Sequence, residues 1–474
     1  MKLNKTKIVA TLGPTSKSRP MLKKLIIAGV DVFRINFSHA KYKETKQTVC
    51  AIRALGAELG VHPSILGDLQ GPKIRLGLVK SGVFVKKNDI IEITTKEIGE
   101  GDEKRVSINY LDFPKDVNAN EKILVNDGKL IFKVLITNKK DLVQAKVLQG
   151  GLLESRKGVN LPNTNLSLPA LTKKDKEDAL FAIKNEFDWI ALSFVRSPKD
   201  VLLLQNLITK NSKYKIPIIA KIEKPEAIAN IDEILEVADG LMVARGDLGL
   251  EIPAEEVPLN QKLLVSKAKY FRKPVIIATQ MMESMIDSLT PSRAEVNDVA
   301  NSIMDGADAV MLSGETSVGQ FPVEVVNTME RIIRRVEDSP LIINPQKLPE
   351  LKSKRLVTKS VCFHATSVAN EINASAISAL TTSGYTAWQI SSWRPNVLIL
   401  VFTSNKKILS QLNLLWGVKC MFYDSFVSTD DTIAEVNEIA KANGFIKNND
   451  LVINLSAMPI AEKGEVNTLR ISKI

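Results

Sequence analysis

A lysine and two carboxylates stand at the ends of two neighbouring apolar segments. The stretch Ile218 to Glu223 reads I-I-A-K-I-E, and residues two apart in a strand point to the same side. Lys221 and Glu223 would therefore leave its end together. The next apolar run, 241–244, is soon followed by Asp247. Carboxylates are ligands for Mg²⁺ or Mn²⁺, and a lysine ammonium can stabilise a phosphoryl group. A structural ion pair at a sheet edge explains this stretch alone equally well.

Polar residues also follow the other apolar segments. Outside residues 72–162, short apolar runs alternate with amphipathic helical patterns about eight times, from Lys7 to Ser313. Eight such units predict a closed parallel β/α barrel, whose active site would lie at the carboxyl ends of the strands. Polar residues at all eight ends favour a functional over a structural explanation. They are Thr11, Arg34, Asn36, Ser38, Asp68, Ser193, Lys221, Glu223, Arg245, Asp247, Thr279, Gln280, Ser313 and Glu315.

Two regions depart from the barrel pattern. From Pro72 to Pro162, short β-rich runs separated by turn pairs predict an inserted all-β domain, a lid of β-barrel type. After Pro340 a polar linker, Asn344 to Lys354, leads to a long helix and a smaller α/β set. We therefore expect a barrel of residues 1–71 and 163–340, an insert of 72–162 and a C-terminal α/β domain of 341–474.

The composition excludes several classes of protein. With 45% apolar and 25% charged residues the chain is typical of a globular protein, and no run is long enough for a membrane span or a signal peptide. The three cysteines are far apart and predict neither disulfides nor a zinc site, which fits the cytoplasm. The charge of +11 is spread along the chain, and aromatics are only 5%, so a lysine-rich surface is favoured over nucleic-acid binding.

Phosphate chemistry would depend on single charged residues. The chain has no P-loop and no protein-kinase signature, whereas Arg34 could grip a phosphate through two hydrogen bonds. Arg75 and Lys157 flank the hinges of the expected insert. Backbone N–H groups from Gly246 onward, at the start of a helix, could hold a carboxylate. The turn Thr381 to Thr386 would suit a phosphate, although a simple helix cap is at least as good an explanation.

The sequence resembles the pyruvate kinase family over nearly its whole length. The resemblance is carried by motifs that occur in the family's order. They are K-I-V-A-T-L-G-P at Lys7, F-R-I-N-F-S-H at Phe33, G-D-L-Q-G-P-K-I-R at Gly67, K-G-V-N-L-P at Lys157, I-A-K-I-E at Ile219, M-V-A-R-G-D-L-G at Met242, A-T-Q-M-M-E-S-M at Ala278, S-R-A-E-V-N-D-V-A at Ser292 and D-G-A-D-A-V-M-L-S-G-E-T at Asp305.

This resemblance implies transfer of phosphate from phosphoenolpyruvate to ADP, giving pyruvate and ATP, the final step of glycolysis. It implies Mg²⁺, for which Mn²⁺ can substitute, and a homotetramer. Glu223 and Asp247 would hold the metal. The implied catalytic residues are Arg34, Lys221 and Thr279, with Gly246 and Asp247 also at the substrate; the implied nucleotide residues are Asn36, His39, Arg75 and Lys157. The group that protonates the enolate stays open between Thr279 with water and the Ser313/Glu315 region.

Two parts of the family pattern differ here. The family's monovalent-cation site would comprise Asn36, Ser38, Asp68 and Leu69, but Leu69 and Lys73 match the K⁺-independent members, so we expect no need for K⁺. A sugar-phosphate or nucleotide effector would bind at Thr381, Thr382, Ser383, Gly384 and Thr386. The loop expected to close that site, Glu462 to Leu469, matches only loosely.

Two other functions share some of these features. A Mg²⁺-dependent barrel lyase acting on a pyruvate enolate would use the same arginine and carboxylates, but it would need neither the insert nor Lys221 and Lys157. A catalytically silent effector-binding protein is disfavoured because every reactive position holds a competent residue. Strict dependence of pyruvate formation on ADP distinguishes the kinase from both.

Overall fold

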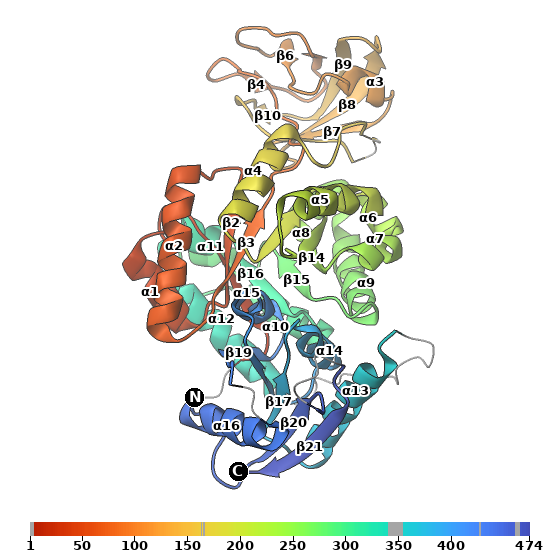
Figure 1. The fold of residues 1–474 in the computed structure, drawn as a ribbon. Coiled ribbons are helices and arrows are strands. Elements are labelled where there is room, and N and C mark those ends of the chain that lie inside the picture. Colours follow the sequence, from red (N-terminus) through yellow and green to blue (C-terminus); the bar gives the residue numbers. More distant parts are fainter. Residues whose placement is uncertain (1–3, 163, 165, 340–353, 426–427, 460–464) are drawn as a thin grey trace.

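The fold has three parts arranged in a row (Figure 1), as seen in a computed structural model. The structure describes residues 4–474 except 163, 165, 340–353, 426–427 and 460–464. A β-rich insert lies at one end, a β/α barrel in the middle, and a second α/β unit at the other end. Most of the expected polar linker, residues 344–353, lies outside the described residues.

Eight parallel strands close the barrel in the order β1-β16-β15-β14-β13-β12-β3-β2, which confirms the expected eight β/α units. Its strands are β1 (Lys7–Thr11), β2 (Val32–Asn36), β3 (Ser64–Asp68), β12 (Trp189–Leu192), β13 (Ile218–Ile222), β14 (Gly240–Ala244), β15 (Val275–Ala278) and β16 (Ala309–Leu312). The stretch from Trp189 to Phe194 reads as one strand in the sequence, but β12 ends at Leu192, because Phe194 takes a left-handed conformation with φ of 53°.

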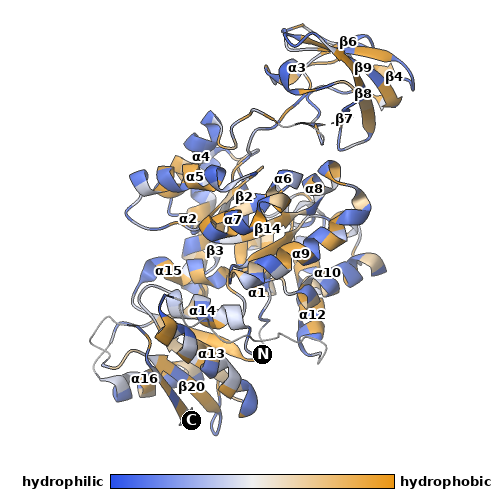
Figure 2. Ribbon diagram, turned by 90° about the vertical axis from the view of Figure 1, so that its right-hand side faces the viewer, coloured by the Kyte–Doolittle hydropathy of each residue, from blue (hydrophilic) through white to orange (hydrophobic). Residues whose placement is uncertain are grey.

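The helices pack their apolar faces on the outside of this barrel. They are α1 (Arg19–Ala28), α2 (Tyr42–Leu59), α4 (Lys173–Lys184), α5 (Pro198–Asn211), α6 (Pro225–Ala229), α7 (Ile231–Val237), α8 (Arg245–Glu251), α9 (Val257–Tyr270), α10 (Arg293–Asp305), α11 (Gly314–Ser317) and α12 (Pro322–Glu337), with 3₁₀ turns at Ala254–Glu256 and Glu283–Ile286. Figure 2 shows apolar strands inside and helices with hydrophilic outer faces. Thr172 caps α4, where its side chain accepts the Asp175 N–H in a capping box.

Side chains also fill the inside of the barrel, as strand alternation requires. Val9, Leu66, Trp189 and Met242 belong to one buried cluster on the inner face. Residues on the other face of the strands pack against the helices in a larger core. The barrel is therefore solid, and only its strand ends are open to a ligand.

The insert follows β3, and its strands β4 to β11 span residues 84–160. Its six-stranded sheet has the order β11-β7-β8-β9-β5-β6 and curls into a half-barrel beside the pair β10-β4. The strands are β4 (Phe84–Val85), β5 (Ile90–Thr94), β6 (Arg105–Ser107), β7 (Lys122–Val125), β8 (Leu130–Thr137), β9 (Leu142–Gln149), β10 (Gly151–Leu152) and β11 (Val159–Asn160). It also holds one helical turn, α3 (Phe113–Asp116), which the sequence pattern did not indicate. Because the chain enters the insert from the end of β3, the insert stands over the carboxyl ends of the strands.

The C-terminal unit is a five-stranded sheet of order β19-β18-β17-β20-β21. Its strands are β17 (Ala376–Leu380), β18 (Leu398–Thr403), β19 (Val418–Phe422), β20 (Leu451–Ser456) and β21 (Thr468–Lys473), and its helices are α13 (Leu356–Glu371), α14 (Tyr385–Trp393), α15 (Lys406–Gln411) and α16 (Thr429–Ala442), with a 3₁₀ turn at Leu412–Leu414. Only β21 is antiparallel, and the sequence pattern did not indicate it. The unit packs on the amino ends of the barrel strands, where Trp189 donates a hydrogen bond to the Gln411 carbonyl.

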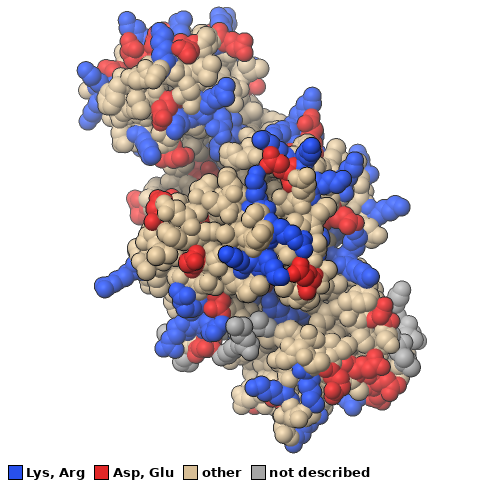
Figure 3. Space-filling view, turned by 90° about the vertical axis from the view of Figure 1, so that its left-hand side faces the viewer, with Lys and Arg blue, Asp and Glu red and all other residues tan. Residues whose placement is uncertain are grey.

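Charge is distributed over the surface as the sequence predicted. Figure 3 shows lysine and arginine side chains over all three parts on one face, mixed with acidic residues. A search of the helices within the described ranges found none that is both long and apolar enough to cross a bilayer.

Candidate active site

Lys221 is the centre of a buried charge cluster at the carboxyl end of β13. Its ammonium lies 3.0 Å from Glu223 Oε1 and 3.1 Å from Asp68 Oδ1, and it donates a 2.6 Å hydrogen bond to Ser193 Oγ. Ser193 in turn donates to the Leu69 carbonyl. The ends of β3, β12 and β13 are thereby tied together around one cation.

Arg34 extends this cluster across the barrel mouth. Its Nε donates to Asp68 Oδ2 at 2.7 Å, and its Nη1 donates to Thr11 Oγ1 at 2.9 Å. The Thr11 hydroxyl in turn donates a hydrogen bond to the Leu312 carbonyl of β16. Asp68 therefore stands between Arg34 and Lys221, and the two cations are held at a fixed spacing.

The electrostatics keep the cluster charged. Burial disfavours a charged Lys221, but the carboxylates of Asp68 and Glu223 outweigh this effect and raise its pKa. Burial also works against a charged Asp68, yet Lys221 and Arg34 lower its pKa overall. At neutral pH Lys221 is a cation and Asp68 an anion, although both are nearly inaccessible to water.

Glu223 and Asp247 form the carboxylate pair expected to hold a metal. Glu223 Oε2 accepts the Phe194 N–H at 2.7 Å, which fixes the carboxylate at the strand end. Burial raises the pKa of Glu223, and the nearby Asp247 carboxylate adds to that effect although Lys221 opposes it. A divalent cation between the two carboxylates would reduce the repulsion between them. Two carboxylate oxygens suit Mg²⁺, with oxygens of substrate and water as its remaining ligands. The described residues contain no group of three or more His, Cys, Asp or Glu arranged for a metal.

Thr279 has a strained backbone next to this pair. Its φ is 69°, a left-handed value that is rare for a β-branched residue, and Gln280 follows with φ of 54°. The Thr279 hydroxyl accepts the Gly246 N–H at 2.8 Å and donates to the Ala278 carbonyl. The structure thus brings Thr279 and the first turn of α8 together, as expected of residues that share a substrate.

The polar residues at two other strand ends have structural partners within the protein. Arg245 pairs with Asp298 at 2.6 Å and donates to the Thr279 carbonyl. Glu315 accepts backbone N–H groups of Ser313 and Met282, so its carboxylate holds the loops in place. Polar strand ends here are therefore partly structural, and the Ser313/Glu315 region is occupied by these backbone hydrogen bonds.

The expected nucleotide residues lie at the edge of the site. An isolated bridge places Arg75 opposite Gly158, so Arg75 and Lys157 lie on neighbouring segments of the chain between the insert and the barrel. Lys157 is 3.2 Å from Glu154. His39 is exposed beyond β2, and the Asn36 side chain accepts the Ser38 N–H at 3.0 Å.

The residues expected to bind a monovalent cation and those expected to bind an effector lie in two different places. Asn36, Ser38, Asp68 and Leu69 adjoin the mouth, but Asp68 is taken up by Arg34 and Lys221, and the Leu69 side chain is buried and has no oxygen. The turn 381–386 follows β17 in the C-terminal unit, where Thr381 Oγ1 accepts the Gly384 N–H. Residues 462–464 of the expected closing loop lie outside the described residues.

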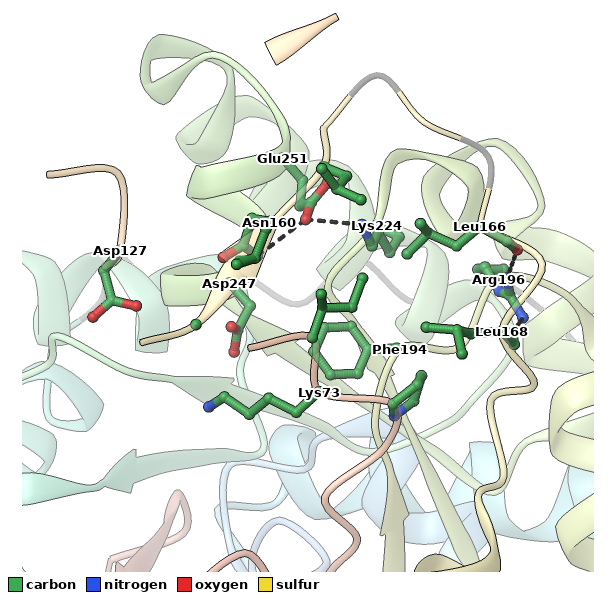
Figure 4. Close-up of a pocket in the computed structure, with 15 residues that line it drawn as sticks. Lys73, Asp127, Asn160, Leu166, Leu168, Phe194, Arg196, Lys224, Asp247 and Glu251 are labelled. Atoms are coloured by element: carbon green, nitrogen blue, oxygen red, sulfur yellow. Dashed lines mark hydrogen bonds and ion pairs between the residues drawn. The ribbon is translucent and has the colours of Figure 1, made fainter. Parts of the chain in front are cut away.

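A small cleft, about 50 Å³ in volume, separates the insert from the barrel mouth (Figure 4). Lys73 and Asp247 line it, as do several residues that sequence reasoning missed: Asn160, Phe194, Arg196, Lys224 and Glu251. Arg196 donates to the carbonyls of Leu166 and Leu168 in the segment leaving the insert. No spacing rule marks these residues, because their contacts join segments far apart in the chain.

Together these features define a barrel enzyme that binds a metal and a phosphorylated substrate beneath an inserted β domain. Comparison with known proteins specifies the class. The sequence model of the pyruvate kinase barrel domain matches residues 3–326, and that of the pyruvate kinase alpha/beta domain matches residues 359–472. The chain belongs to the pyruvate kinase family and has the activity of that family, phosphate transfer between phosphoenolpyruvate and ADP.

Full-length relatives support this assignment. Pyruvate kinase 2 of Synechocystis is 42% identical over 99% of this chain and 79% of its own length. The enzyme of Geobacillus stearothermophilus is 41% identical over 99% of this chain and 80% of its own, and that of Corynebacterium glutamicum is 41% identical over 98% and 97%. A crystal structure of a pyruvate kinase from Cryptosporidium parvum superposes with a TM-score of 0.90 at 35% identity, covering 99% of this chain and 96% of that one.

Proposed function

We propose that phosphate transfer takes place beside Lys221, whose ammonium stabilises the phosphoryl group as it moves from phosphoenolpyruvate to ADP. The observation that carries this proposal is the buried, charged state of Lys221 between Asp68 and Glu223. A fixed cation in a water-poor site stabilises developing negative charge without reorganisation during the reaction. Lys221 also lies near the carboxyl end of β13, and active sites of β/α barrels lie at that end of the strands.

Arg34 binds the phosphate of the substrate in this proposal. Asp68 and Thr11 hold its guanidinium in one orientation, and its remaining N–H groups can then meet phosphate oxygens with little loss of side-chain entropy. Gly246 and Thr279 contact the rest of the substrate, since they lie together beside Asp247. Thr279 is also a candidate for passing a proton to the enolate carbon through water.

Glu223 and Asp247 would hold Mg²⁺, or Mn²⁺ in its place. The metal would act as a Lewis acid that neutralises charge on the phosphoryl oxygens. Asn36, His39, Arg75 and Lys157 would meet the nucleotide, as the family resemblance implies. We propose the domain boundaries given by the sequence: 1–71 with 163–340, 72–162, and 341–474.

A coupled assay for pyruvate tests the reaction. Formation of pyruvate from phosphoenolpyruvate must be strictly dependent on ADP and on a divalent metal. Pyruvate release without ADP would instead support a lyase. A protein with no turnover under any of these conditions would support a silent effector-binding role.

We also propose that the enzyme needs no K⁺. The proposal is supported by Leu69, which offers no side-chain oxygen, and by Lys73, which lines the cleft and whose covalently attached ammonium can replace a mobile cation. The test compares activity in tetramethylammonium buffer with and without K⁺. Activation of about tenfold or more, which corresponds to about 1.4 kcal/mol, would refute the proposal.

Regulation and assembly complete the proposal. A sugar phosphate or nucleotide would bind at residues 381–386, where the turn enters α14 and offers several hydroxyl groups. Titrations with fructose 1,6-bisphosphate, ribose 5-phosphate and AMP would shift the phosphoenolpyruvate response if this site works. We propose a cytoplasmic homotetramer, as the family resemblance implies, which sedimentation can test.

A further inference from the structure

One carboxylate joins three parts of the active-site cleft. Glu251 Oε1 lies 2.8 Å from the Lys224 ammonium and accepts a 3.1 Å hydrogen bond from the Asn160 side-chain amide (Figure 4). The side chains of Lys224 and Glu251 are 6% and 1% exposed. A buried, hydrogen-bonded charge pair fixes the elements that carry it, because separating the charges leaves each without solvent or partner.

These three residues come from elements with different roles. Lys224 directly follows the metal carboxylate Glu223 at the end of β13. Glu251 is the last residue of α8, one turn after Asp247, and residues four apart lie on the same face of a helix. Asn160 ends β11, the last strand of the insert. A displacement of the insert therefore acts on the elements that carry both proposed metal ligands.

The insert comes close to the same end of α8 at a second point. A Cβ atom built on Gly128, in the turn between β7 and β8, would lie 3.4 Å from Leu250 Cδ2. Asp127 of the same turn lines the cleft together with Asp247. The last turn of α8 thus faces the insert, while its first turn carries the proposed metal and substrate residues.

Glu251 has not used all of its hydrogen-bonding capacity. Its Oε2 is buried and accepts no hydrogen bond from any residue that the structure describes. A buried carboxylate oxygen without a donor is unfavourable, so the position of the carboxylate depends strongly on the two donors it has. Only one of these, Asn160, belongs to the insert.

We propose that Glu251 is a positioning residue that couples docking of the insert to the placement of Asp247 and Glu223. When Asn160 donates to Glu251, α8 is held against β13 and the two metal carboxylates keep the spacing that a divalent cation needs. When the insert moves away, this restraint on α8 is lost and metal affinity falls. The proposal rests on the metal roles given above.

The test removes the insert's donor and leaves the Lys224–Glu251 pair intact. In Asn160→Ala we expect the Mn²⁺ dissociation constant, measured from the free-Mn²⁺ electron paramagnetic resonance signal without substrates, to rise about five- to tenfold, the usual size of coupling between sites. The Mg²⁺ concentration for half-maximal activity should rise by a similar factor. A purely structural role for Asn160 would move neither quantity.

A matched control is available inside the insert. Asn118 donates its side-chain amide to Glu121 Oε1 at 3.1 Å, the same kind of bond at the same length, but with both partners in the insert. Asn118→Ala should bind Mn²⁺ like the wild type. Equal Mn²⁺ affinities for Asn160→Ala and the wild type would overturn the coupling, as would an equal loss in both asparagine variants.

Two further variants separate the coupling from the metal assignment. Asp247→Ala must weaken Mn²⁺ binding more than Asn160→Ala does; if it has no effect, the proposed metal site is wrong and the coupling fails with it. In a Glu251→Met background, which lacks the acceptor oxygen, Asn160→Ala should add little, because both changes act through one contact. Fully additive losses would show that Asn160 acts by another route and would refute the proposal.

Discussion

Replacing Lys221 by methionine tests the central charge of the site. The change keeps the length of the side chain and removes its ammonium, which contacts Asp68, Glu223 and Ser193. Removing one fixed group that stabilises transition-state charge typically slows turnover about 100- to 1000-fold. Because Asp68 and Glu223 would stay buried without this partner, the free energy of unfolding should also fall by about 3–5 kcal/mol.

Lys7→Met is the matched control for loss of a buried lysine. Lys7 begins β1 at the opposite end of the barrel, where its fully buried ammonium lies 3.3 Å from Asp31 and donates to the Val418 carbonyl. This variant should lose some stability, although less, because Asp31 keeps Lys419 at 3.3 Å. Its turnover should remain close to that of the wild type.

The assay is pyruvate formation at saturating phosphoenolpyruvate, ADP and Mg²⁺, with urea midpoints measured on the same preparations. A Lys221→Met enzyme within about fivefold of wild-type turnover would refute the catalytic role, since a loss this small is about 1 kcal/mol. Equal loss of turnover in Lys7→Met would show that weakened folding, and not chemistry, explains the effect.

Three other changes have expected outcomes. Asp247→Asn should raise the Mg²⁺ concentration for half-maximal activity at least about tenfold, since it removes one of two protein carboxylates; an unchanged Mg²⁺ response would contradict the assignment. Glu251→Gln should lower the free energy of unfolding by about 3–5 kcal/mol because Lys224 then stays buried without its counter-ion, and urea unfolding measures this. Burial, with Arg394 nearby, lowers the pKa of Lys269 from 10.5 to about 8. Between these two pH values the unfolded chain binds more protons than the folded protein, so the free energy of unfolding should rise with pH. Lys269→Met should show a smaller rise in urea midpoint over this pH range, and a rise identical to that of the wild type would argue against a lowered pKa.

Sequence reasoning was most successful where local pattern and chain order carry the information. Eight apolar runs with helices between them predict a barrel because parallel strands need covering on both faces, and strand-end residues such as Lys221 and Asp247 then gather at one mouth. Strand ends were less certain. Phe194 looks like a continuation of β12, but its backbone turns away so that its N–H reaches Glu223. β21 was missed because four of its six residues are polar and its position at a sheet edge depends on β20.

The sequence by itself determined the residue types at the barrel mouth, the order of the parts and the family. Tertiary structure decided how those residues are connected. Asp68 bridges Arg34, which is 34 positions away in the chain, and Lys221, which is 153 positions away. Glu251 accepts a hydrogen bond across the cleft from Asn160, which is 91 positions away. The physical reason is that periodicity and propensity act over a few residues, whereas a buried hydrogen bond or ion pair depends on which distant segments the folded core brings within about 3 Å.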